Sequence, residues 1–151
     1  MGLLDRLRTA ISGPPLSEEL ATLAGQCEAL VNRLRRHAER PLYPAIANGV
    51  REIAKREAEH DRILRRILAE RGLWPRPPEE LPQDGSSNWQ RLNGDLLMLQ
   101  LFSQELNRHA VKWQAEDLQM SEMLRTIASE ASDSEFELRK LTAKLDPQAI
   151  D

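Results

Sequence analysis

The most constraining feature of this sequence is an apolar stripe at helical spacing that two polar residues interrupt. Between Ile46 and Leu68, apolar residues recur in steps of three and four, which predicts an amphipathic helix with one buried face. Glu57 and His60 occupy the two stripe positions where this period calls for core residues. Because burying a carboxylate without a partner is costly, the pair requires a structural or functional explanation.

The composition indicates a helical protein with one domain. Of the 151 residues, 40% are hydrophobic, 30% are charged and only 4% are aromatic. A chain of this length can form one domain with a single hydrophobic core. The only cysteine, Cys27, excludes an internal disulfide and fits a reducing compartment. Charges close to Met1 argue against an export signal, and no apolar run is long enough for a membrane span. We therefore expect a cytoplasmic protein that does not bind membranes.

Apolar periodicity and helix-breaking residues predict four long helices and a short one before them. The long helices cover residues 17–40, 45–71, 87 or 88 to about 112, and 118–145. The last two are separated somewhere between Lys112 and Leu118, with one continuous helix as the alternative. Residues 3–11 predict a short amphipathic helix that packs on the bundle or on a neighbouring subunit, with a membrane or partner peg as the alternative.

One long connection, residues 72–87, separates the second predicted helix from the third. Its prolines keep it extended, and its length allows it to run along a whole helix. It is therefore predicted to be a crossover pinned to the bundle by Trp74 and Leu81, with a PxxP-type ligand as the alternative. The domain organisation is an N-terminal segment and linker (1–15), a helical bundle (16–146) and a short tail (147–151).

The two halves of the chain resemble one another. The matching segments are 51–54 with 125–128 and 64–67 with 138–141, at an offset of 74 (125 − 51), and 34–38 with 106–110, at an offset of 72 (106 − 34). This repeat predicts two similar helical hairpins, joined by the crossover, in a bundle with pseudo-twofold symmetry. Under the alignment Glu57 corresponds to Ala131, and His60 corresponds to Ser134.

Two hairpins, a long crossover and the motif Glu57-Ala58-Glu59-His60 in a helix seam resemble the ferritin-like superfamily, especially its rubrerythrin-like domains. The resemblance covers residues 17–145 and implies an all-α four-helix bundle. It also implies a di-iron site, built from one Glu on one helix of each hairpin and Glu-x-x-His on the other, with oxidase or peroxidase chemistry. Only one of these four elements is clearly present, because Ala131 and Ser134 stand where the second Glu-x-x-His is required.

The candidate metal ligands are Glu57, His60 and Glu28, and three interpretations of them remain open. In the first interpretation, Glu57 and His60 form a metal-free polar remnant. They then hydrogen-bond to each other, to Gln26, to Ser134 or to water. Alternatively, the pair holds one iron ion together with Glu28 or Cys27, or with the same residues of a second subunit. A working redox centre would need the full ligand set.

Three other residues receive structural interpretations. Cys27 lies on an apolar stripe, which is typical of a small core residue. His37 and His109 lie at equivalent helix ends beside arginines, and we expect both to be solvated residues that favour the helix dipole.

Two function classes follow from these observations. The first is a ferritin-like bundle without redox chemistry that acts as a binding or structural homo-oligomer and is not an enzyme. The alternative is an iron-binding protein with a one-metal or intersubunit site that performs oxidase or peroxidase chemistry. Arginines crowd the first hairpin and acids crowd the last helix, which favours association with another copy or a protein partner. The net charge of −3 argues against nucleic-acid binding.

Overall fold

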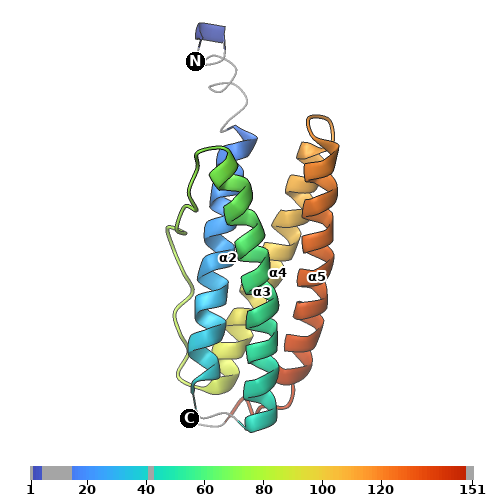
Figure 1. Ribbon diagram of the computed structural model, residues 1–151. Helices are drawn as coiled ribbons and strands as arrows, with labels where there is room; N and C mark the ends of the chain where they lie inside the picture. Colours follow the sequence, from blue (N-terminus) through green and yellow to red (C-terminus); the bar gives the residue numbers. More distant parts are fainter. Residues whose placement is uncertain (1, 5–14, 41–42, 149–151) are drawn as a thin grey trace.

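A computed structural model describes residues 2–4, 15–40 and 43–148, which contain four long helices and no strand (Figure 1). The helices are α2 (Leu16–Ala38), α3 (Pro44–Glu70), α4 (Asn88–Trp113) and α5 (Leu118–Thr142). The all-α prediction is confirmed. Most of the predicted helix over 3–11, and residues 149–151 of the tail, fall outside the described residues. None of the helices in the described ranges is long and apolar enough to cross a membrane.

Local capping explains where the helices of the second hairpin begin. The Ser87 hydroxyl accepts a hydrogen bond from the Gln90 amide at 3.1 Å, and this N-cap starts α4. The Asp117 carboxylate accepts from the Met120 amide at 3.1 Å, so a cap starts α5 without a glycine or proline. The break predicted between residues 112 and 118 is confirmed. Helix α5 ends at Thr142, earlier than the predicted residue 145.

The helices form two hairpins, α2 with α3 and α4 with α5, which pack together through α2–α4 and α3–α5 contacts. After α3, the connection to α4 runs beside α2 to the opposite end of the bundle (Figure 1). This is the long crossover that the prolines predicted. The apolar stripes of all four helices meet in one core, whose largest members are fully buried. They include Leu30, Leu34, Ile53, Leu64, Leu99, Leu106, Leu124 and Leu138.

The crossover is attached to α2 by its backbone. The Arg76 amide donates to the Ala21 carbonyl at 2.8 Å, and a Cβ atom at Gly25 would overlap the Arg76 carbonyl group. Only glycine permits this close approach. The prediction that Trp74 pins the crossover was wrong, since its side chain is 78% exposed. The neighbouring Leu73 packs against the core instead.

The prediction that His37 and His109 are solvated was also wrong. They are 1% and 3% exposed, and both lie on the faces of α2 and α4 that meet. His37 follows the core residue Leu34 by three positions, so helix geometry turns it inward while Arg35 and Arg36 remain exposed. A position near the end of a helix therefore does not predict that a side chain is exposed. Burial depends on which face of the helix the side chain occupies.

Candidate functional site

Helix α3 carries Glu57 and His60 into the interior of the bundle. Their i, i+3 spacing places both side chains on one face, and they are 0% and 1% exposed. His60 Nδ1 lies 3.0 Å from Glu57 Oε1. The two side chains are therefore within hydrogen-bond distance of each other.

Helix α5 completes the environment of the Glu57 carboxylate. The Ser134 hydroxyl donates to Glu57 Oε2 at 2.9 Å, and Arg56 Nη1 donates to the Ser134 oxygen at 3.1 Å. A guanidinium thus reaches the buried carboxylate through one hydroxyl group. Ala131, on the same face of α5, is fully buried and adds no polar atom.

Glu130 connects His60 to the surface. Its Oε2 atom lies 2.6 Å from His60 Nε2, and its side chain is 51% exposed. Burial of the imidazole disfavours its charged form, but the hydrogen bonds and charges of Glu57 and Glu130 outweigh this effect and raise the pKa of His60. When protonated, His60 donates one hydrogen bond to each carboxylate, so the site holds a proton between two acids.

Two contacts of this site are equivalent under the internal repeat. Arg56 corresponds to Glu130 (130 − 56 = 74), and His60 corresponds to Ser134 (134 − 60 = 74). Arg56 of α3 contacts Ser134 of α5, and Glu130 of α5 contacts His60 of α3. The same geometry therefore occurs twice with different chemistry. Sequence reasoning did not select Arg56 and Glu130, because both lie beside the apolar stripe; their equivalence in the repeat was the signal that could have found them.

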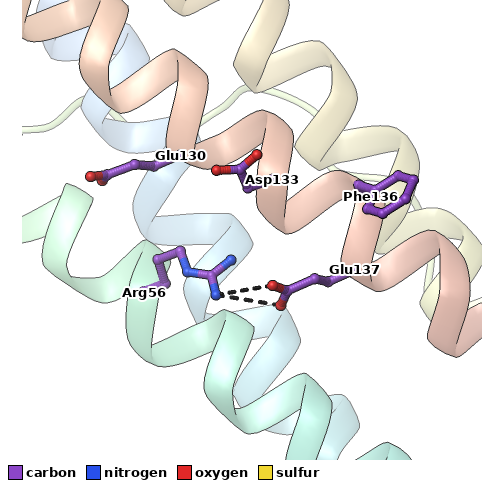
Figure 2. Close-up of a pocket in the computed structure, with 5 residues that line it drawn as sticks. All are labelled: Arg56, Glu130, Asp133, Phe136 and Glu137. Carbon is purple, nitrogen blue, oxygen red and sulfur yellow. Dashed lines mark hydrogen bonds and ion pairs between the residues drawn. The ribbon is translucent and has the colours of Figure 1, made fainter.

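A groove of about 430 Å³ lies between α3 and α5 on the outer side of this network. Figure 2 shows its lining residues, Arg56, Glu130, Asp133, Phe136 and Glu137, with Arg56 Nη2 lying 3.3 Å from Glu137. Three of the five are acids, so the groove favours positively charged groups. Glu130 both lines this groove and contacts His60, so it connects the groove to the buried pair.

Glu28 and Cys27, the other predicted ligands, are engaged elsewhere. Glu28 forms an ion pair with Arg65 at 2.8 Å, with its side chain 41% exposed. Cys27 is buried, and its Sγ lies 3.5 Å from the Glu57 carbonyl oxygen. Burial, followed by the nearby Glu57 charge, raises the pKa of the Cys27 thiol well above its usual value. The thiol therefore stays protonated and packs as a small core residue, as predicted.

These donors do not fit a di-iron centre. Helix α2 contributes a protonated thiol, and the inward face of α5 contributes Ala131 and Ser134, where that centre needs carboxylates and an imidazole. Arg56 already supplies a fixed positive charge through Ser134. Among the residues that the structure describes, no group of three or more His, Cys, Asp or Glu side chains is placed to hold a metal ion.

Comparisons with protein-family models, with curated proteins and with solved structures found no significant match to this chain.

Proposed function

We propose that this chain is a ferritin-like bundle that acts in the cytoplasm as a non-catalytic binding or structural module. In this proposal, Glu57 and His60 are a self-contained polar network in place of a metal centre. The observation that carries the proposal is the Arg56–Ser134–Glu57 chain of hydrogen bonds, which brings a permanent cation to the carboxylate that a metal would need. Both oxygens of Glu57 and both nitrogens of His60 already have protein partners.

Such a network has a structural use. Every member of a buried polar network must keep its partners, so sliding α3 against α5 by one turn would leave charges without partners. The network therefore favours one register of the two hairpins. This role uses the residues of the candidate metal site without requiring a metal.

The surface supports a binding role through its charges. The groove between α3 and α5 carries Glu130, Asp133 and Glu137, whereas Arg35 and Arg66 are exposed on α2 and α3. Exposed groups of opposite charge favour association between copies or with a charged protein partner. Of these two kinds of association, we propose that the chain forms a homo-oligomer.

Two measurements on the purified full chain test the proposal. The first is incubation with ferrous iron in air, followed by determination of bound iron and of the near-ultraviolet absorption of an oxo-bridged centre. We expect neither stoichiometric iron nor this absorption. Stoichiometric iron that is lost in Glu57→Ala but kept in Glu28→Ala would overturn the proposal. The second is sedimentation, in which we expect an oligomer that dissociates as salt concentration rises.

One observation favours a second candidate, an iron-binding protein with a one-metal or intersubunit site and oxidase or peroxidase chemistry. His60 lies 3.0 Å from Glu57, and carboxylate and imidazole groups are iron ligands. This candidate predicts that Glu57→Ala and His60→Ala both lose bound iron. If both variants bind as much metal as the natural chain, the candidate fails.

A further inference from the structure

A buried histidine faces a hollow between α2 and α4. His109 is 3% exposed, and it lines a hollow of about 210 Å³ together with Glu19 of α2 and Glu105 of α4. Its Nδ1 atom lies 4.0 Å from Glu19 Oε2, and its Nε2 atom lies 3.7 Å from Glu105 Oε2. Both distances exceed hydrogen-bond reach, and Nδ1 has no hydrogen-bond partner in the described part of the chain.

The protonation of His109 leaves two acceptors facing each other. Burial lowers the pKa of this imidazole, so the ring is neutral near pH 7. A neutral imidazole carries a hydrogen on one nitrogen and a lone pair on the other. Whichever nitrogen carries the hydrogen, the other presents its lone pair toward the carboxylate of Glu19 or Glu105. A group with N–H donors between these two acceptors would satisfy both.

The neighbouring cations bind the two acids but not the imidazole. Lys112 Nζ donates to Glu19 at 3.1 Å, and Arg108 Nη2 donates to Glu105 at 2.5 Å. Within the described ranges, neither cation donates to His109. A carboxylate has about four acceptor positions on its two oxygens, so both acids can accept further hydrogen bonds. Around His109, the hollow therefore offers acceptors to a ligand that brings donors.

A second hollow, of about 150 Å³, continues from the first toward the crossover. Gln26 of α2 lines both hollows. The second lining is mainly apolar and includes Leu81, Pro82, Met98, Leu101 and Phe102. On α4 the lining residues of both hollows follow one another in steps of three and four from Met98 to His109, so they share one face of the helix. The two hollows therefore form one groove, here called the α2–α4 groove, with a polar end and an apolar end.

We propose that the α2–α4 groove binds a primary amine with an apolar chain, whose ammonium group lies between His109 and a facing carboxylate and whose chain covers Leu101 and Phe102. An ammonium group has three donors and no acceptor, which suits the polar end. The two hollows together reach the size of small-molecule sites, which begins at about 300 Å³. The site shares no lining residue with the groove between α3 and α5, and it is independent of whether Glu57 and His60 bind metal.

Calorimetric titration of the full chain at about pH 7.5 tests the proposal with three probes, octylamine, octanol and butylamine. At this pH an alkylamine is protonated, as a lysine side chain is. We expect octylamine to bind, and octanol to bind about tenfold more weakly because it lacks charge-assisted hydrogen bonds. Butylamine, which has the length of a lysine side chain, should also bind at least about tenfold more weakly, because fewer methylene groups leave water.

Glu105→Gln tests the polar end of the groove. The new amide removes the negative charge and supplies an N–H donor near His109, so the affinity for octylamine should fall about tenfold. Glu122→Gln is the matched control, because it makes the same change at an exposed position of α5 and should keep the natural affinity. Neither acid is buried, so both variants should fold, which circular dichroism checks.

Leu101→Ser tests the apolar end. Leu101 and Leu97 are 53% and 51% exposed on the same helix, but only Leu101 lines the groove. Leu101→Ser should weaken octylamine about threefold and leave butylamine unchanged, whereas Leu97→Ser should change neither. The proposal is overturned if octylamine does not bind, or if octanol or butylamine binds as tightly. Equal octylamine affinity in either groove variant and its matched control would overturn it as well.

Discussion

Glu130 of α5 lies 2.6 Å from His60 of α3, and the repeat places Arg56 and Ser134 in the same relationship at 3.1 Å. One contact joins an acid to an imidazole, and the other joins a guanidinium to a hydroxyl. The two hairpins are therefore held by equivalent positions with unlike chemistry. The charge of the imidazole makes the His60 contact sensitive to pH.

The pKa of His60 is raised, so its contribution to stability has a definite sign. The contribution is fully present below the ordinary histidine pKa of about 6.5 and is lost as the pH rises through the higher pKa of the folded state. We expect the difference in unfolding free energy between the natural chain and His60→Gln to shrink over this alkaline window. Urea unfolding at a series of pH values measures it, and a difference that grows with pH would contradict the assignment.

Ser134→Ala should destabilise the bundle by about 1–3 kcal/mol, because it leaves one oxygen of the buried Glu57 carboxylate without its donor. Ser132→Ala is the control, since Ser132 is exposed on the same helix and should change stability by about 0.5 kcal/mol or less. Chemical unfolding of both variants gives the comparison. Equal effects would mean that the Ser134 hydroxyl contributes nothing specific.

Arg33→Met should cost about 3–5 kcal/mol, because the variant leaves Asp95, which is fully buried, without its guanidinium partner at 3.1 Å. Arg36→Met removes an exposed partner of Asp84 and should cost about 1 kcal/mol or less. Thermal and urea unfolding of the two variants distinguish these values. Similar losses in both variants would show that burial does not set the strength of these ion pairs.

Gly25→Ala should destabilise the protein by about 1–3 kcal/mol, since the new methyl group overlaps the Arg76 carbonyl and must displace the crossover. At Gly49 the new methyl group would meet only the flexible end of Leu141, while alanine gains about 1 kcal/mol in helix propensity. Gly49→Ala should therefore be close to neutral. Chemical unfolding of the two variants tests the close approach of the crossover to Gly25. If Gly25→Ala leaves the unfolding free energy unchanged, that close approach is refuted.

The helical period predicted the four helices, and turn chemistry predicted their boundaries to within a few residues, because both are local properties of the chain. The repeat also identified Ala131 and Ser134 as the residues opposite Glu57 and His60. Arg56 and Glu130 were not predicted as site residues, because they lie off the apolar stripe. They join the site only when α3 packs against α5. The role of Glu28 was equally undecidable, since Arg65 reaches it from another helix.

The sequence by itself determined that this chain forms an all-helical protein with a polar pair in an apolar seam, since periodicity and capping act over a few residues. Only the tertiary structure decided which charges meet. It buried His37 between two aspartates and left His109 without an acid within hydrogen-bond reach, although the two histidines occupy equivalent positions in the repeat. The physical reason is that electrostatic partners come from distant segments, and their distances are fixed only when the helices pack.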